Sequence, residues 1–167
     1  AQGLGLTLLD ADGRPLPTGA TAADLSRVAR LVGPAPLEDR VVWAWADVET
    51  PLLDSAALFG PQKGASMREI AQIQEGLKVW VAVVNQWRES QGLPAVDGEE
   101  RGMGAAGGLG FALRALLDAL VTPGTPALAR LLGLGDALEG VEVLVTGEGC
   151  VDPSSFHGKV VGYAVAR

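Results

Sequence analysis

The chain has 167 residues, 48% of them hydrophobic and 20% charged, so a packed core is expected and disorder is not. Its formal net charge of -7 excludes general nucleic-acid binding, which needs a basic face. A single cysteine, Cys150, and a single histidine, His157, exclude an internal disulfide, a cysteine-cluster metal site and a histidine-pair metal motif. No run has the ~20 apolar residues of a membrane span and no signal peptide is recognisable, so we expect no membrane partner and a cytoplasmic location.

The N-terminal part of the sequence predicts short elements. Residues 4–9 are predicted to form a strand, and Thr21 is a plausible N-cap for a helix over residues 22–31. Residues 40–46 form a short, almost wholly apolar run. Such a run is typical of a strand in a buried parallel sheet.

A long amphipathic helix is predicted to begin after Ser66, where Glu69 stands at the spacing of a capping box. A second helix is predicted from Ala105, followed by a short helix over residues 126–132 and a strand over residues 141–145. The tryptophans fall at strand and helix spacings and are expected in the core: Trp43, Trp45, Trp80 and Trp87.

Strands that alternate with helices indicate an α/β fold with a mostly parallel sheet flanked by helices. In such sheets, ligands bind beyond the carboxyl ends of the strands. Asp47 and Glu148 each follow a predicted strand, so they are expected to face one cleft. Asp47 could be a turn or helix-capping residue, a general base for a substrate hydroxyl, or a metal ligand.

A glycine-rich segment at residues 102–110 precedes and enters the second helix. Residues 102–107 match the letters G-x-G-x-x-G, but no strand precedes them and the nearest later acid is Asp118, so a dinucleotide-binding fingerprint is excluded. Two interpretations remain for the glycines. They allow the helix to pack closely on the sheet, or they free main-chain amides to hold an anion.

Two further groups carry charge in tight loops. Lys63 lies between Gly60-Pro61-Gln62 and Gly64, and is either a solvated surface lysine or a cation aimed at an anion. Glu148 and Asp152 flank a turn, and either cap the next helix or hold Mg²⁺ through their oxygens, often through water.

Cys150 has no activating histidine and is expected to be passive. An anion site, carboxylates and lysines together suggest phosphoryl transfer.

Three segments of this chain resemble the bacterial type-one glycerate kinase family, which phosphorylates D-glycerate with ATP and Mg²⁺. They are Phe-Gly-Pro-Gln-Lys-Gly-Ala at 59–65, Gly-Ala-Ala-Gly-Gly-Leu-Gly-Phe-Ala-Leu at 104–113, and Thr-Gly-Glu-Gly at 146–149 with Asp152, Ser155, Gly158 and Lys159. Residues 8–16 also look like the family's sequence ahead of the first segment. The chain departs from the family pattern at Thr50, where the family has asparagine, and at Ser154, where it usually has glutamine.

The resemblance implies a role for each matched residue. Asp47 would act on the substrate hydroxyl or the metal, Lys63 and Lys159 would offset the charge of phosphate or carboxylate, and the product would be 2-phosphoglycerate. Glu148 and Asp152 would hold Mg²⁺ or its waters. The residues that would bind substrate or phosphate are Gly104, Ala105, Ala106, Gly107, Gly108, Ser155 and Lys159.

Family members are longer than this chain and resemble two α/β lobes with the site between them. We therefore expect both ends to be cut, so that the chain is a single α/β segment of a longer kinase. Residues 1–104 would belong to a middle lobe region, and residues 105–167 would begin the return into the other lobe. Two alternatives stay open: an inactive fragment that forms a homodimer, or an anion-binding module of unrelated role.

Overall fold

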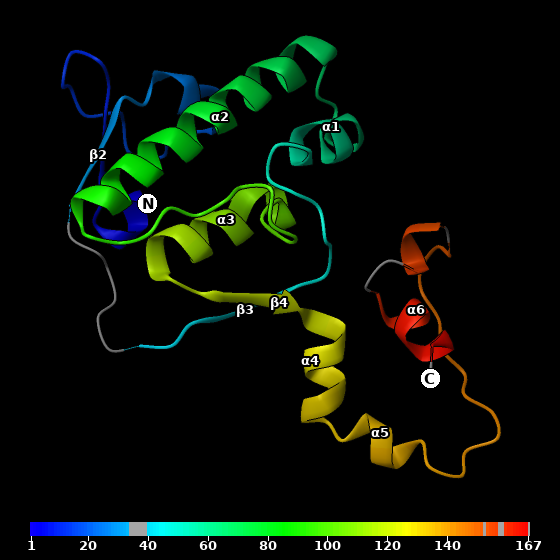
Figure 1. Ribbon diagram of the computed structural model, residues 1–167. Helices are drawn as coiled ribbons and strands as arrows, with labels where there is room; N and C mark the ends of the chain where they lie inside the picture. The colour runs from blue at the N-terminus through cyan, green and yellow to red at the C-terminus, as the bar shows by residue number, and fades with distance from the viewer. Residues whose placement is uncertain (34–39, 152, 157–158, 167) are drawn as a thin grey trace.

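The computed structural model describes residues 1–33, 40–151, 153–156 and 159–166, which form a mixed α/β fold (Figure 1). The strands are β1 (Thr7–Leu9), β2 (Arg30–Val32), β3 (Trp43–Ala46) and β4 (Leu120–Pro123). The α-helices are α1 (Ser55–Phe59), α2 (Met67–Ser90), α3 (Ala105–Leu117), α4 (Gly124–Leu131), α5 (Leu134–Ala137) and α6 (Val160–Val165). The 3₁₀ turns are η1 (Gln2–Leu4), η2 (Ala22–Arg27), η3 (Pro61–Lys63) and η4 (Pro153–Phe156).

The described strands form two sheets of two strands each. β1 pairs with β2 in the antiparallel sense, whereas β3 pairs with β4 in the parallel sense, with Trp43 opposite Leu120 and Ala46 opposite Pro123. The expected parallel sheet is therefore confirmed for β3–β4, but the expectation that most of the pairing is parallel is wrong for the described residues. The mixed α/β class itself is confirmed.

Helix α2 forms as its sequence predicts. The N–H of Ser66 donates to Oε2 of Glu69 at 2.7 Å, and the N–H of Glu69 donates back to Oγ of Ser66 at 3.3 Å, which completes the capping box. Trp80 and Trp87 are buried, and the Trp87 indole donates to the carbonyl of Gly33 at 2.9 Å. The apolar face of this helix therefore supplies the middle of the core.

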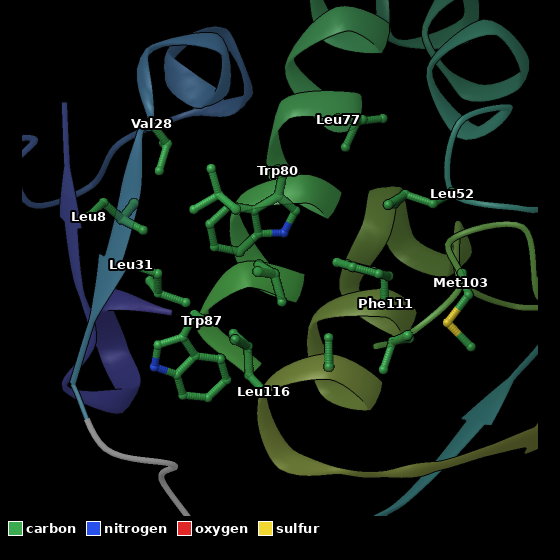
Figure 2. Packing of buried hydrophobic residues seen from close by; sticks show 14 of the residues in the cluster. Leu8, Val28, Leu31, Leu52, Leu77, Trp80, Trp87, Met103, Phe111 and Leu116 are labelled. Carbon is green, nitrogen blue, oxygen red and sulfur yellow. The ribbon is translucent and has the colours of Figure 1, made fainter. Parts of the chain in front are cut away.

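The core lies between the β1–β2 sheet, α2 and α3, as Figure 2 shows. Leu8, Val28 and Leu31 approach the α2 tryptophans from one side. On the other side the core is closed by the following residues: Leu52, Met103, Phe111, Ala115 and Leu116. Because Leu52 and Met103 lie in the segments that carry the candidate site, the site is attached directly to this core.

Several sequence predictions are wrong in extent. The strand predicted over residues 4–9 is limited to β1, because Leu4 belongs to η1 and Gly5 ends that turn in a left-handed conformation. The helix predicted over residues 22–31 is a 3₁₀ turn that ends at Arg27, and the chain then enters β2. Thr21 does begin that turn, paired with Asp24 in a capping box. The second long helix, predicted from Ala105, does begin there and ends at Leu117, after which the left-handed backbone of Asp118 leads the chain toward β4.

Two strand predictions also differ from the structure. β3 is shorter than residues 40–46, and Trp43 and Trp45 are exposed instead of lying in the core. Residues 141–145 are irregular and largely exposed, although their sequence is apolar and β-branched. A strand requires a hydrogen-bonding neighbour, and this run has none among the described residues. Within the described part of the chain, every helix is too short or too polar to cross a lipid bilayer.

Candidate functional site

Asp47 lies where the two parallel strands end. It directly follows β3, and Gly124 at the start of α4 directly follows β4. Because parallel strands run in the same direction, their carboxyl ends meet at one edge of the sheet, the usual ligand edge of an α/β fold. Asp47 is exposed there.

Lys63 is carried by the tight turn η3. Its N–H donates to the carbonyl of Gly60 at 3.0 Å, and the turn closes at Gly64, whose φ is 82°. Gly60 is packed so tightly that a side chain would meet the carbonyl of Ala56 and the side chain of Ile70. The turn is therefore anchored on α1 and α2, which fixes the point from which the lysine side chain extends.

The glycine-rich segment turns left-handed as it enters α3. Ala106, Gly107 and Gly108 have φ values of 50°, 71° and 102°. For Ala106 this conformation is unfavourable by about 1–2 kcal/mol, because its Cβ crowds the following carbonyl. Such outliers cluster at ligand-binding and active sites, so Ala106 supports a functional role for this turn.

Gly104 shows that close packing is part of this segment's role. Its N–H donates to the carbonyl of Thr50 at 2.8 Å, and a Cβ there would collide with the carbonyl oxygen of Pro51. The amides of Gly107 and Gly108 donate to the carbonyl of Gly104 at 3.1 and 3.3 Å. These amides are thus already bonded within the chain, and anion binding by the segment stays a prediction.

Three of the predicted features meet in one hollow of about 200 Å³, which we call the polar hollow. Its lining residues are Asp47, Val48, Phe59, Gln62, Lys63, Ala106 and Gly107. The structure therefore brings together the carboxylate, the lysine and the left-handed turn. Phe59 and Gln62 were not singled out as site residues from the sequence, although both lie in the segment that carries Lys63.

A second, larger hollow of about 480 Å³ also reaches Asp47, and we call it the apolar hollow. Leu128 of α4 and Leu132, which follows that helix, line it together with Trp45 and Tyr163. Thr146 and Val160 line it too; Thr146 is two residues before Glu148, and Val160 directly follows Lys159. Asp47 thus lines both the polar hollow and the apolar hollow.

The other predicted site residues that the structure describes do not line the polar hollow. Nζ of Lys159 lies 3.1 Å from Oε1 of Glu148, so the predicted phosphate-binding lysine and the predicted metal ligand form an ion pair. Ser155 is buried, and its hydroxyl donates to the carbonyl of Cys150 at 3.5 Å. Asp152 lies outside the described residues.

The donor set of the described residues can be compared with the needs of Mg²⁺. No group of three histidine, cysteine, aspartate or glutamate side chains gathers in the described ranges. Mg²⁺, however, is commonly held by one or two carboxylates together with substrate phosphates and waters. Asp47 and Glu148 each offer such a carboxylate, so the residues present fit a metal that arrives with a phosphate ligand.

The chain is thus an α/β protein in which a carboxylate, a lysine and a strained glycine-rich turn share one small hollow at the ends of parallel strands. Ligands of α/β folds usually bind at this edge of the sheet. The sequence model of the glycerate kinase family matches residues 1–167. The chain belongs to the glycerate kinase family.

Individual relatives agree with this family. The chain is 34% identical over 163 residues to glycerate 2-kinase of Escherichia coli K12, covering 95% of this chain and 42% of that protein. It is 31% identical over 176 residues to the glycerate kinase of Halalkalibacterium halodurans, covering 99% of this chain and 44% of that protein. A solved structure of a protein assigned as glycerate kinase 2 from Salmonella typhimurium LT2 superposes with a TM-score of 0.72 and 31% identity, over 98% of this chain and 44% of that one. The chain spans less than half the length of these relatives.

Proposed function

We propose that this chain forms one side of the active site of a glycerate kinase that transfers a phosphoryl group from ATP to D-glycerate and yields 2-phosphoglycerate. The observation that carries the proposal is the convergence of Asp47, Lys63 and the left-handed turn at Ala106 in one hollow. Family membership makes a hydroxy acid and a nucleotide the expected ligands. The expected cytoplasmic location and the absence of a nucleic-acid partner belong to the same proposal.

The polar hollow suits the acid better than the nucleotide. Its volume of about 200 Å³ is below the roughly 300–1,000 Å³ of sites for drug-sized ligands. A three-carbon acid fits with its carboxylate toward Lys63 and a hydroxyl toward Asp47. The amide of Gln62 offers both a donor and an acceptor to a second hydroxyl, and Phe59 supplies an apolar wall for the carbon chain.

Each residue then has a defined task in phosphoryl transfer. Asp47 accepts the proton of the attacking hydroxyl, which increases the nucleophilicity of that oxygen. Lys63 offsets the negative charge of the acid or of the transferred group. The turn at Gly104–Gly108 would orient anionic oxygens once amides that donate to carbonyls within the chain are released to the ligand. No covalent enzyme intermediate is needed, because positioning and charge stabilisation account for most of the catalysis in this reaction class.

Magnesium, when bound, would neutralise charge on the nucleotide phosphates. Glu148 and Asp152 are the residues that would hold it. Since Glu148 is paired with Lys159, the carboxylate would exchange an ammonium partner for the metal, and the released lysine would become available to phosphate. Ser155, which lies between Glu148 and Lys159 in the sequence, is buried.

The domain assignment follows from the same interpretation. Residues 1–104 would form the middle lobe region and residues 105–167 the start of the return into the other lobe of a longer enzyme.

The homodimer considered from the sequence finds no support among the relatives, whose descriptions name no assembly. An anion-binding module without kinase activity is the remaining alternative, since the polar hollow alone does not require a nucleotide.

Substitution of Asp47 and Lys63 tests the proposal. In a polypeptide that carries the full length of the relatives, Asp47→Asn is expected to lower turnover by about 10²–10⁴-fold, because the hydroxyl loses its general base. In the 167-residue chain, Lys63→Ala is expected to weaken D-glycerate binding about tenfold or more in calorimetry. The matched controls are Asp136→Asn and Lys78→Ala, which change exposed charges outside the hollow.

Three results would contradict the proposal. Normal turnover of Asp47→Asn would remove its catalytic role, and unchanged glycerate affinity of Lys63→Ala would remove its binding role. Binding of glycerate without any recognition of Mg-ATP by the full-length polypeptide would favour the anion-binding module, since a kinase must recognise both.

A further inference from the structure

A third hollow, of about 170 Å³, lies at the carboxyl ends of β3 and β4, and we call it the strand-end hollow. Its lining residues are Ala46, Asp47, Val48, Glu49, Arg101, Gly102, Val121, Thr122 and Pro123. The polar hollow also has Asp47 and Val48 in its lining, so the two hollows adjoin just after β3. A water molecule takes about 30 Å³ of the liquid, so the strand-end hollow has room for a metal ion and several of its waters.

Three oxygen donors of the strand-end hollow have no partner among the described residues. They are the carboxylate of Asp47, the main-chain carbonyl of Val48 and the hydroxyl of Thr122. The Thr122 hydroxyl oxygen is also buried. Buried polar groups are nearly always hydrogen-bonded, so an unpartnered one points to a water or an ion that completes the site.

The fourth oxygen donor is Glu49, which forms an ion pair across the rim of the hollow. Nη1 of Arg101 lies 3.1 Å from Oε2 of Glu49, and the two side chains are 81% and 41% exposed. This pair leaves the charge of Asp47 uncompensated within the strand-end hollow. The formal net charge of -7 on the chain adds to this local negative charge, so the hollow attracts cations.

Gly102 keeps the space beside the Val48 carbonyl open. Its φ of 84° favours glycine, and an added Cβ would lie 3.2 Å from Cγ1 of Val121 and 3.3 Å from Cβ of Ala46. The same Cβ would lie 3.6 Å from the carbonyl oxygen of Val48. A side chain at this position would therefore fill part of the strand-end hollow next to one of its oxygen donors.

We propose that the strand-end hollow binds a hydrated divalent cation of the Mg²⁺ type. Hard cations of this kind take carboxylate and carbonyl oxygens as ligands, and Mg²⁺ keeps several of its waters. Asp47 and Glu49 supply the negative charge. The Val48 carbonyl and the Thr122 hydroxyl bind the ion or the waters around it.

Other positions and other ligands fit the observations less well. Glu148 is paired with Lys159 and does not line the strand-end hollow, so the cation proposed here is distinct from one held at Glu148. An anion such as phosphate is the poorer occupant. Arg101 alone would attract it, whereas Asp47 and Glu49 would both repel it.

The ion pair at the rim gives this site an unusual response to substitution. Arg101 competes with the cation for the carboxylate of Glu49. Loss of an oxygen donor weakens cation binding, but loss of the guanidinium removes a competitor and a repelling charge. Arg101→Gln is therefore expected to strengthen binding, although it deletes a residue that lines the hollow.

The consequence for catalysis rests on the proposed function. The hydroxy acid and the phosphoryl donor are both anions, and an uncompensated Asp47 would repel them. A cation in the strand-end hollow offsets that repulsion beside the polar hollow. An ionised carboxylate has two oxygens and about four lone-pair sites, so Asp47 can contact the cation and still accept the proton of the substrate hydroxyl.

Calorimetric titration of the 167-residue chain with MgCl₂, in the absence of nucleotide and acid, tests the cation site. Glu49→Gln and Thr122→Val are each expected to weaken Mg²⁺ binding about tenfold or more. Arg101→Gln is expected to strengthen it about two- to fivefold, the weight of an exposed ion pair. Glu75→Gln and Lys78→Gln are the matched controls, because they alter an exposed ion pair on α2, and they are expected to leave the affinity unchanged.

Two further measurements separate a binding role from a structural one. Since the Thr122 hydroxyl has no protein partner, Thr122→Val is expected to leave the urea midpoint without Mg²⁺ unchanged or higher, while the stabilisation that Mg²⁺ adds becomes smaller. Tb³⁺ replaces Mg²⁺ as a luminescent probe. Its emission, excited through Trp45 two residues before Asp47, is expected to fall in Glu49→Gln and to persist in Glu75→Gln.

Several results would overturn the cation site. They are no Mg²⁺ binding by the unchanged chain, equal affinity in Glu49→Gln, weaker affinity in Arg101→Gln, or loss of binding in Glu148→Gln alone. Cation binding together with normal turnover of Asp47→Asn in the full-length polypeptide would leave the cation site intact and refute the proposed function. D-glycerate binding that depends on Lys63, without cation binding that depends on Glu49, would do the reverse.

Discussion

Two glycines of the glycine-rich segment, Gly107 and Gly104, differ in how much stability an alanine substitution is expected to cost. The larger loss is expected at Gly104, although only Gly107 has a left-handed backbone. Gly107 has a φ of +71° but nothing within 4 Å of an added Cβ, so Gly107→Ala meets only the left-handed penalty. That penalty is about 1–2 kcal/mol, offset in part by about 0.4–1 kcal/mol from the stiffer unfolded chain. We expect Gly107→Ala to lower the free energy of unfolding by about 0.5–1 kcal/mol.

Gly104 has an ordinary φ of -81°, which alanine adopts without strain. Its added Cβ would instead meet two backbone oxygens, the carbonyl of Pro51 and, at 2.9 Å, that of Thr50. Overpacking against backbone costs about 1–3 kcal/mol, and displacement of the Gly104–Thr50 hydrogen bond adds about 1 kcal/mol. Gly104→Ala is therefore expected to lower the free energy of unfolding by about 2–4 kcal/mol.

Urea unfolding of the 167-residue chain, followed by circular dichroism and tryptophan emission, measures both values. The D-glycerate affinity of Gly107→Ala separates packing from binding, because its methyl group enters the polar hollow while the fold survives. If Gly104→Ala proved as mild as Gly107→Ala, the close approach of the glycine-rich segment to residues 50–51 would be wrong, and with it the placement of the turn beside Asp47.

Two further predictions concern the supports of the site. Arg88 is 1% exposed and donates to the carbonyls of Pro94 and Ala115 at 2.6 and 2.7 Å, so Arg88→Ala is expected to lower the free energy of unfolding, measured in urea, by about 3 kcal/mol. Asp118→Asn alters only an exposed partner of Arg88 and is expected to cost less than about 1 kcal/mol. Equal losses for the two variants would contradict this prediction. Hydrogen bonds from the side chain and backbone of Ser66 lower the pKa of Glu69, so their stabilisation is present above the unfolded-state pKa and is lost as pH falls through the folded-state pKa. Ser66→Ala is expected to flatten the stability profile between about pH 5 and about pH 3, and a profile parallel to that of the unchanged chain would refute the coupling.

Helix α2 could be predicted because its signals are local, whereas the helix predicted over residues 22–31 is a 3₁₀ turn. The capping residues and the apolar stripe of α2 lie within one segment, and each turn of the helix satisfies its own hydrogen bonds. The strands could not be placed in the same way. The apolar runs at 40–46 and 141–145 have similar composition, but only the first finds a parallel neighbour, β4, in the described residues. Strand formation depends on a partner that composition does not specify.

The candidate site was predictable in part. Asp47 follows from the position of a strand end, and Lys63 and the turn at 104–108 from glycine-rich sequence at helix starts, and these do meet in one hollow. The ion pair between Glu148 and Lys159 could not be foreseen, because their separation along an irregular stretch of chain carries no periodic signal. Gln62 was overlooked because an exposed glutamine in a loop usually has no special role.

The two charged groups of the polar hollow stand on different supports. Lys63 extends from the turn that Gly60 holds against α1 and α2, whereas Asp47 directly follows a strand of the small parallel sheet. The spacing of the carboxylate and the ammonium therefore depends on how this sheet packs against the helical core. A substitution at the junction of sheet and core would change that spacing without altering either charged residue.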